Sequence, residues 1–222
     1  MTGFLIVLSS PSGGGKTTIA RRLIERRSDM AFSVSATTRP MRPGERDGVD
    51  YYFLTREEFE RRRDVGEFLE MASYEGNLYG TLMSEVRDIM DAGRHAVLDI
   101  EIEGGRQVRQ RKPDAVLIFI LPPSAAVLTE RLRARDTDDQ QVVMGRLSTA
   151  AKEIEAAREY DYVVLNDTLE HAVAQVEAIV EAERRRVGRH AGLSEMIEAF
   201  RRDLTAEVAS LREHVAHKEH SE

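Results

Sequence analysis

The sequence contains no cysteine and no tryptophan among its 222 residues, and aromatic residues make up only 6% of it. Without thiols the chain can have no disulfide framework, no thiolate zinc site and no cysteine nucleophile. Four of its six histidines (His190, His214, His217 and His220) follow residue 189, away from any carboxylate-rich strand end. A histidine-based metal site is therefore not expected.

The chain also lacks a long apolar run and an excess of positive charge. Its longest strongly apolar run, Phe4–Leu8, is too short to span a bilayer, and no basic segment typical of a secretory signal precedes it. A formal net charge of −7 argues against a protein that coats nucleic acid. We therefore expect a cytoplasmic protein that binds neither membranes nor nucleic acid.

What the sequence does contain is an alternation of short apolar runs and helical patterns. The apolar runs, each predicted to form a buried strand, are Phe4–Leu8, His95–Ile100, Ala115–Leu121 and Tyr162–Leu165. Helical patterns follow from Lys16 and cover residues 103–111, 124–134, 141–159 and 169–187. Buried strands that alternate with helices are typical of a parallel sheet covered on both faces. The predicted fold class is α/β, with a parallel β-sheet core flanked by helices.

Residues 33–93 differ from this pattern and are predicted to form an inserted, mixed α+β subdomain. Their short strands are joined by Pro/Gly turns and cover Ser33–Thr38, Tyr51–Leu54 and Phe68–Tyr74. Thr55-Arg-Glu-Glu58 is a capping box that predicts a helix start, and Gly93 is typical of a helix end.

The strongest functional motif is Ser10-Pro-Ser-Gly-Gly-Gly-Lys-Thr17, between a predicted strand and a predicted helix. Glycines let successive backbone N–H groups point at phosphate oxygens, while a Lys reaches the outer phosphates and a Ser or Thr hydroxyl serves Mg²⁺. The predicted ATP-binding residues here are Ser12, Gly13, Gly14, Gly15, Lys16, Thr17 and Thr18. The strict pattern needs Gly at position 10, and the alternative is a chance glycine-rich turn, but both flanking elements favour a phosphate loop.

Two further features accompany the loop. Asp99 ends a buried strand, where a carboxylate can orient the water ligands of Mg²⁺ or can simply cap the strand. Arg39 and Arg42 lie three residues apart in a Pro-stiffened loop, which suits a bidentate phosphate clamp, with Tyr51 and Tyr79 as hydroxyl donors. An isolated pair of this kind would be read as a solvated surface pair. The guanine signature of GTPases, N-K-x-D, is missing, which disfavours a GTPase switch.

Several linked motifs resemble those of the guanylate kinase family. They are Ser35-Ala-Thr-Thr-Arg-Pro-Met-Arg-Pro-Gly-Glu45, Gly48-Val-Asp-Tyr-Tyr-Phe53, Glu67-Phe-Leu-Glu70, Gly76-Asn-Leu-Tyr-Gly80, Leu98-Asp-Ile100, Phe119-Ile-Leu-Pro-Pro-Ser124, Arg131-Leu-Arg-Ala-Arg135, Tyr160-Asp-Tyr162 and Asn166-Asp167. The resemblance runs in order from about residue 4 to 187. It implies a P-loop nucleoside monophosphate kinase that transfers the γ-phosphate of ATP to GMP, and to dGMP, with Mg²⁺ as cofactor.

The resemblance also implies residue roles. The GMP phosphate would be held by Ser35, Arg39, Arg42, Tyr51 and Tyr79, and the guanine edge would be read by Glu70, Thr81 and Glu101. On the ATP side, Lys16 would hold the phosphates, Thr17 and Asp99 would serve Mg²⁺ through water, and Asn166 would contact adenine. The predicted catalytic residues are Lys16, Arg39, Arg131, Arg135 and Arg146. This chain has Glu101 where the family usually has Asp, and Ala134 and Asp136 where it usually has Gly.

The implied organisation is a kinase-like domain over residues 1–187 and a tail over 188–222. Within the first, the core covers 1–32, 94–133 and 147–187, the GMP-binding insert 33–93 and a lid 134–146. In the tail, Leu193, Ile197, Phe200, Leu204, Val208, Leu211 and Val215 predict an amphipathic helix with one narrow apolar seam. Such a helix docks on its own core or pairs copies of the chain. Two other functions stay open: a non-catalytic, guanylate-kinase-like interaction module and a kinase acting on a sugar phosphate.

Overall fold

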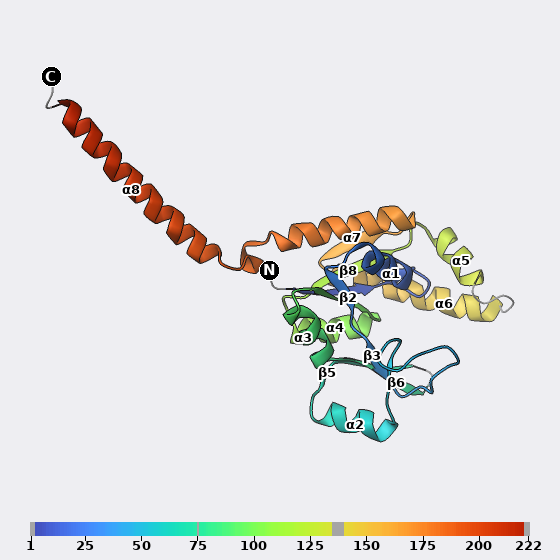
Figure 1. Cartoon of the computed structure of the whole chain (residues 1–222). Coiled ribbons are helices and arrows are strands. Elements are labelled where there is room, and N and C mark those ends of the chain that lie inside the picture. The colour runs from blue at the N-terminus through green and yellow to red at the C-terminus, as the bar shows by residue number, and fades with distance from the viewer. Residues whose placement is uncertain (1–2, 75, 135–139, 220–222) are drawn as a thin grey trace. The chain divides into compact units, whose positions relative to one another are not determined.

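The computed structural model describes residues 3–74, 76–134 and 140–219, with side chains described as far as Arg212. The chain divides into two compact units, residues 2–180 and residues 181–222. The first unit contains two separate β-sheets, one of five strands and one of four strands (Figure 1).

The five-stranded sheet is entirely parallel among its paired strands and has the order β2-β7-β1-β8-β9. Its strands are β1 (Leu5–Ser9), β2 (Met30–Phe32), β7 (His95–Asp99), β8 (Val116–Leu121) and β9 (Tyr162–Leu165). Alternate side chains of each strand point to opposite faces, so β1 contributes Ile6 and Leu8 to one face and Leu5 and Val7 to the other. Both faces are buried, which explains the continuous apolar runs of the sequence.

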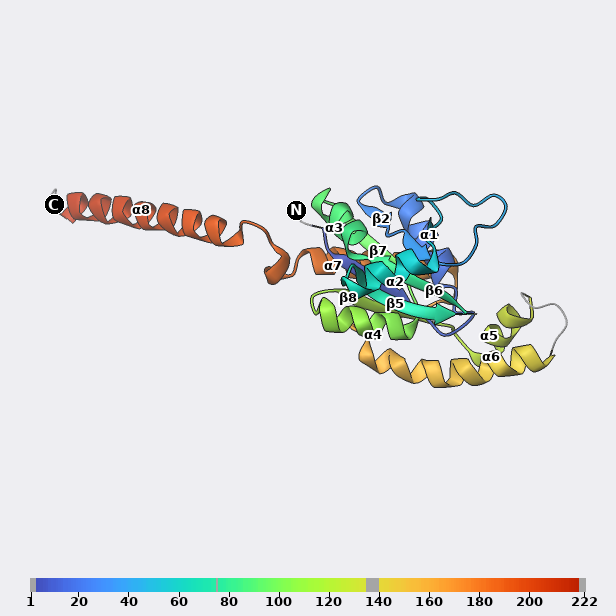
Figure 2. The same ribbon diagram turned by 90° about the horizontal axis from the view of Figure 1, so that it is seen from below.

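Helices cover both faces of this sheet. On the first face α1 (Lys16–Arg26) packs through Ile19 and Leu23, together with α7 (Leu169–Arg184), which contributes Val173 and Val176. On the second face α3 (Met83–Asp91) packs through Val86 and Ile89, together with α4 (Ile102–Arg111), as Figure 2 shows from below.

The four-stranded sheet has the order β4-β3-β6-β5 and comes entirely from residues 35–82. Its strands are β3 (Ser35–Thr37), β4 (Tyr52–Phe53), β5 (Phe68–Tyr74) and β6 (Asn77–Leu82). One short helix, α2 (Arg56–Asp64), packs Phe59 against Phe68, with ring centroids 4.3 Å apart. The predicted cap is confirmed, because the Thr55 hydroxyl accepts a hydrogen bond from the Glu58 N–H at 3.1 Å.

The remaining elements of this unit are α5 (Ala125–Arg133), α6 (Gln140–Glu153) and a 3₁₀ segment over Ile154–Glu159. Leu128 and Leu132 of α5 pack against Val143 and Ala150 of α6. The single helix predicted over 141–159 therefore continues only to Glu153 and then tightens to 3₁₀ geometry.

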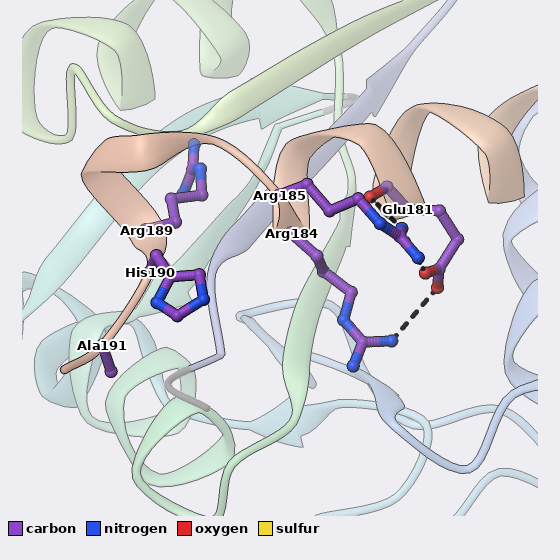
Figure 3. Close-up of a pocket in the computed structure, with 6 residues that line it drawn as sticks. All are labelled: Glu181, Arg184, Arg185, Arg189, His190 and Ala191. Carbon is purple, nitrogen blue, oxygen red and sulfur yellow. Dashed lines mark hydrogen bonds and ion pairs between the residues drawn. The ribbon is translucent and has the colours of Figure 1, made fainter. Parts of the chain in front are cut away.

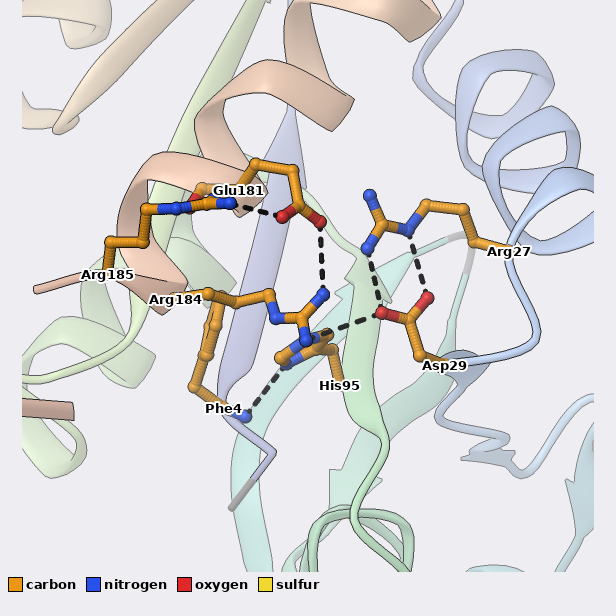
Figure 4. Close-up of polar contacts among 7 residues, drawn as sticks. All are labelled: Phe4, Arg27, Asp29, His95, Glu181, Arg184 and Arg185. Atoms are coloured by element: carbon orange, nitrogen blue, oxygen red, sulfur yellow. Dashed lines mark hydrogen bonds and ion pairs between the residues drawn. The ribbon is translucent and has the colours of Figure 1, made fainter. Parts of the chain in front are cut away.

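A buried polar contact lies at the amino-terminal ends of strands β1, β2 and β7. His95 of β7 is 5% exposed, and its Nδ1 accepts the Phe4 backbone N–H at 3.2 Å (Figure 4). Its Nε2 lies 3.9 Å from Asp29, which is held in turn by a bidentate pair with Arg27 at 2.7 and 2.9 Å. The acceptor role of Nδ1 places the ring proton on Nε2, toward the Asp29 carboxylate.

The second unit contains the end of α7, a 3₁₀ turn at Val187–Arg189 and the long helix α8 (Leu193–Glu219). A pocket of about 340 Å³ is lined by Glu181, Arg184, Arg185, Arg189, His190 and Ala191 (Figure 3). Glu181 pairs with Arg184 and with Arg185, each at 3.1 Å, so part of this basic charge is neutralised locally.

The parallel sheet flanked by helices confirms the predicted fold class. Two strands were not predicted from the sequence, β2 and β6. The helical tail is confirmed by α8. Residues 135–139, which include the predicted Arg135 and the substituted Asp136, lie outside the described residues, and the side chain of Val215 is likewise not described.

Candidate active site

The glycine-rich loop joins β1 to α1 at the carboxyl end of the parallel sheet. Gly13 and Gly15 have φ angles of 84° and 92°, in the left-handed region that glycine alone adopts without strain. A Cβ on Gly15 would lie 2.5 Å from the side-chain nitrogen of Asn166, which itself donates to the Gly14 carbonyl at 2.8 Å. Glycine is therefore required at position 15 by both conformation and space.

The loop ends at the N-terminus of α1, which carries no side-chain cap and no acidic residue in its first turn. The N–H groups of a first turn lack partners within the helix, and the helix dipole adds a partial positive charge there. Lys16 is the first residue of this turn. The arrangement is the usual one for binding a phosphate group.

Two carboxylates face the Lys16 ammonium. Parallel pairing places Asp99 of β7 opposite Leu8 of β1, and Lys16 Nζ lies 3.7 Å from Asp99 Oδ1. Glu101, at the start of α4, approaches more closely, with its Oε1 2.7 Å from Nζ. Burial alone would lower the pKa of Lys16, but Glu101 and then Asp99 outweigh it and raise that pKa above its ordinary value. The ammonium is therefore fully charged at neutral pH.

Asp99 keeps unused hydrogen-bonding capacity. Its Oδ1 is buried and has no hydrogen-bond partner among the described residues. Burial raises the pKa of this carboxyl, and the Lys16 charge and a hydrogen bond with Thr17 oppose the rise. Thr17 and Asp99 thus place a hydroxyl and a buried carboxylate together, which are oxygen ligands of the kind that suits Mg²⁺ or its water shell.

Two arginines reach the loop from α5 and α6. Arg131 donates to the Asn166 carbonyl at 3.0 Å, and its other terminal nitrogen, NH1, is buried without a partner in the described part of the chain. The Arg146 Nε donates to the Ser12 hydroxyl at 3.2 Å. Lys16, Arg131 and Arg146 therefore gather on one loop, together with the predicted Asn166.

The second cluster lies on the mixed sheet. Glu70 of β5 is only 4% exposed, and its Oε1 accepts a hydrogen bond of 2.7 Å from the hydroxyl of Thr81, its cross-strand partner on β6. Burial raises the pKa of the Glu70 carboxyl, and the hydrogen bonds from Thr81 oppose that rise. The other carboxylate oxygen, Oε2, lies over Gly104 of α4.

Helix α4 holds the strand that carries Glu70. The side-chain amide of Gln107 exchanges two hydrogen bonds with the backbone of Met71, at 2.9 and 3.0 Å. Arg111 donates to the carbonyls of Phe68 and Leu69 at 2.8 and 2.6 Å. A Cβ on Gly104 would lie 2.7 Å from Glu70 Oε2, so the close approach of helix and carboxylate needs glycine.

The two predicted arginines of the 33–93 segment differ in their surroundings. Arg39 donates to Glu45 at 2.7 Å and lies over the Tyr51 ring, 5.5 Å from its centroid. The Tyr51 and Tyr79 rings meet edge to face at 6.1 Å, and burial raises the pKa of the Tyr51 hydroxyl. Arg42 is exposed, and its backbone N–H donates to the same Glu45.

The pairing register of β3 and β6 places Ser35, the remaining predicted residue, in this cluster. Ser35 on β3 pairs with Thr81 on β6, and Thr37 pairs with Tyr79. The neighbouring β-strands thus bring Ser35, Tyr79, Thr81 and Glu70 together, although they are far apart in the sequence.

Sequence reasoning missed three residues of these clusters. Glu153 accepts the Ser12 backbone N–H at 3.0 Å, Glu45 holds Arg39, and Gly104 supports Glu70. Glu45 and Gly104 lie inside or beside motifs that the sequence displays, but no motif singles out Glu153. Glu101 was predicted to face a base, and it pairs here with Lys16.

A parallel α/β sheet with this loop, Lys and buried Asp at its carboxyl edge defines a P-loop nucleotide-binding protein. The sequence matches the family model described as guanylate kinase over residues 3–183. A guanylate kinase of Symbiobacterium thermophilum is 48% identical over 85% of this chain and 89% of the relative, and one of Desulfitobacterium hafniense is 47% identical over 84% and 94%. The crystal structure of guanylate kinase from Anaplasma phagocytophilum has a TM-score of 0.72 at 37% identity, covering 89% of this chain and 95% of the other. The chain belongs to the guanylate kinase family.

The contact between Gly104 and Glu70 generates a stability prediction. Gly104→Ala should lower the free energy of unfolding by about 1–2 kcal/mol, because the new Cβ displaces a buried carboxylate that Thr81 also holds. Gly145→Ala, inside α6 with nothing within 4 Å of the new Cβ, should instead raise it by about 0.5–1 kcal/mol through helix propensity. Chemical denaturation of the two variants measures the difference, and equal shifts of the same sign would contradict it.

Proposed function

We propose that this chain transfers the γ-phosphate of ATP to GMP, and to dGMP, giving ADP and the corresponding diphosphate. The observation that carries the proposal is the presence, in one compact unit, of a phosphate loop with a charged Lys16 and of a buried carboxylate, Glu70. The first suits a phosphoryl donor, and the second suits a base with hydrogen-bond donors on its edge. Membership of the guanylate kinase family supports the same conclusion.

On the donor side, the proposed ATP-binding residues are those of the loop, Ser12 to Thr18. The backbone N–H groups and Lys16 would bind the β- and γ-phosphates, and Asn166, which already hydrogen-bonds the loop, would lie at the adenine. Mg²⁺ would be held, through water, by the Thr17 hydroxyl and by Asp99, whose Oδ1 has spare acceptor capacity. The ion would neutralise phosphate charge there.

On the acceptor side, Arg39, Arg42, Ser35, Tyr51 and Tyr79 would hold the GMP phosphate. Arg39 is pre-positioned, because Glu45 and the tyrosine ring fix its guanidinium. Arg42 is exposed and would complete the clamp on binding.

The guanine edge would be read by Glu70, Thr81 and Glu101. Guanine presents N1–H and N2–H₂ donors, and Glu70 is a buried acceptor whose Oε2 is not the oxygen that accepts the Thr81 hydroxyl. For Glu101 to reach a base, its contact with Lys16 must open, and arrival of ATP phosphates at Lys16 would release it.

The reaction itself requires alignment and charge neutralisation more than a covalent nucleophile. A phosphate oxygen of GMP attacks the γ-phosphorus, a new P–O bond forms, and the bond to the β–γ bridging oxygen breaks to leave ADP. Lys16, Arg39, Arg131, Arg135 and Arg146 would balance the negative charge spread over the transferred group. The loop, insert 33–93 and lid 134–146 would close together to exclude water.

Two other functions need testing against this one. A non-catalytic interaction module would have no need for the P-loop Lys and its buried Asp, and a sugar-phosphate kinase would have no need for the buried carboxylate Glu70. A coupled assay of ADP release over a panel of GMP, dGMP, IMP, AMP and sugar phosphates separates all three. No turnover with any acceptor would favour the module, and turnover with a sugar phosphate alone would favour the second rival.

Besides the two nucleotides, the one further partner that we propose is a second copy of this chain, bound through the tail 188–222. Within the described residues no helix has the length and apolarity needed to cross a membrane.

The donor site yields a prediction for Lys16. Lys16→Ala should lower kcat by at least about 100-fold, because the ammonium stabilises charge that develops on the transferred phosphoryl group. GMP binding, measured by calorimetry, should not weaken, because loss of the ammonium frees Glu101 for the base, and circular dichroism should show that the fold is retained. Turnover near that of the wild type would contradict the assignment of this loop.

The Lys16–Glu101 contact yields a prediction with opposite effects on the two substrates. Glu101→Gln should lower the Kd for ATP severalfold, because a competing carboxylate leaves the ammonium, and should raise KM for GMP. Glu103→Gln, two residues away, is the matched control and should change neither value. Equally weaker binding of ATP and of GMP in Glu101→Gln would show that the Lys16–Glu101 contact does not compete with phosphate.

The buried carboxylate yields a prediction on base selection. The wild type should use GMP and dGMP far better than AMP, by on the order of 10⁴ in kcat/KM, because adenine presents its N1 lone pair to Glu70. IMP, which keeps N1–H but lacks the amino group, should be intermediate. Glu70→Gln should lower kcat/KM for GMP more than kcat/KM for ATP. An unchanged kcat/KM for GMP would contradict the proposed role of Glu70 in reading the base.

A further inference from the structure

Helix α8 (Leu193–Glu219) carries an exposed apolar stripe that plays no part in the proposed chemistry. The large apolar residues Ile197, Phe200, Leu204, Val208 and Leu211 are between 47% and 64% exposed. Figure 1 shows α8 as one uninterrupted helix. Single exposed apolar residues are ordinary on protein surfaces, but a continuous stripe along one helix face marks an interaction surface.

The stripe follows an 11-residue repeat. Leu193, Ile197 and Phe200 are followed, 11 residues later in each case, by Leu204, Val208 and Leu211. Eleven residues over three turns give 3.67 residues per turn, close to the 3.6 of an α-helix, so the stripe stays on one face along the helix. A repeat of this length is typical of helices that pair with a slight right-handed supercoil.

Over residues 201–212 the two flanks of the stripe carry opposite charges. Arg201 and Arg212, also 11 residues apart, directly follow Phe200 and Leu211 and lie on one flank. Asp203 and Glu207 directly precede Leu204 and Val208 and lie on the other. Arg201 already pairs with Glu198 within the helix at 3.0 Å, so the contact between helices rests chiefly on Arg212 and Glu207.

We propose that two copies of this chain associate through α8, as a parallel and in-register pair of helices. In a parallel pair each flank faces the opposite flank of the partner, so the basic side of one helix meets the acidic side of the other. Glu207 and Arg212 are five residues apart, which is the spacing of interhelical ion pairs on either side of a parallel seam. The two-fold axis forms this ion pair twice.

The same charges disfavour the other arrangement. In an antiparallel pair each flank of one helix faces the same flank of its partner. Arginines would then meet arginines and carboxylates would meet carboxylates, which makes the free energy of association less favourable. The stripe is thus complementary to a parallel copy of itself. Association through α8 is independent of the proposed kinase activity.

The first test is the mass of the full chain in solution. Light scattering should give twice the 25.1 kDa of one chain for the wild type. Leu204→Glu, in the middle of the stripe, should give single chains, whereas Ala206→Glu, on the opposite face of the same turn, should leave the dimer intact. A wild type that is a single chain at all concentrations, or an assembly that Leu204→Glu does not change, would overturn the proposal.

The second test is the orientation of the pair. Glu207→Arg and Arg212→Glu should each raise the dimer Kd by roughly tenfold, because both symmetric ion pairs become repulsive. An equimolar mixture of the two variants should restore wild-type affinity, since every cross-pair is then attractive. An antiparallel pair predicts that Arg212→Glu tightens association, and that result would overturn the parallel arrangement.

The absence of cysteine gives an independent measure of register. Leu211→Cys should form a disulfide between identical positions of two chains on mild oxidation, because a native chain with no thiol offers no competing partner. Ala206→Cys, on the opposite face, is the control and should not cross-link. Failure of Leu211→Cys to cross-link while the dimer persists would rule out an in-register parallel pair.

Discussion

Parallel pairing of β1 with its two neighbours decides where the chemical groups of this chain meet. All three strands end at the same edge, so the loop after β1 lies next to Asp99, the last residue of β7, on one side. On the other side β9 follows β8, and Asn166, the first residue after β9, reaches the Gly14 carbonyl. Open parallel sheets bind ligands at this edge for the same reason, because it is where side chains from separate strands converge. Without this register Lys16 would have no buried counter-charge.

The buried charges of the site are tolerable only because each is partly compensated. A charged group taken out of water costs several kcal/mol unless partners replace the lost solvation. Lys16 has Asp99 and Glu101, and Glu70 has the Thr81 hydroxyl. The compensation is incomplete at Asp99 Oδ1, which lies 3.7 Å from the Lys16 ammonium, and at one nitrogen of Arg131; neither atom has a hydrogen-bond partner among the described residues. Incomplete compensation of this kind lowers the free energy of unfolding, but it leaves acceptors and donors available for a ligand.

Much of this site follows from local sequence, and the rest follows from contacts between distant segments. The loop, its strand and its helix are predictable because glycines, an apolar run and a helical period occur together. Strands β2 and β6 were missed, since three residues give no period and the β6 run Asn77–Leu82 contains a glycine and polar side chains. Its strand character comes from pairing with β3 and β5. Glu153 was missed because its hydrogen bond to Ser12 spans 141 residues, and no local pattern encodes such a contact.

The two units differ in the source of their stability. The helices around the parallel sheet are fixed by burial, so their intrinsic helix propensity matters little. Helix α8 has a solvated apolar stripe, and within its own unit no described element covers that stripe. An isolated helix gains about one hydrogen bond per residue but no packing, and most helical stability in proteins comes from packing of an apolar face. Association would supply the missing burial, which makes the order of α8 depend on protein concentration through mass action. Packing of α8 would then come from the assembled pair, whereas the candidate active site is held by contacts within residues 2–180.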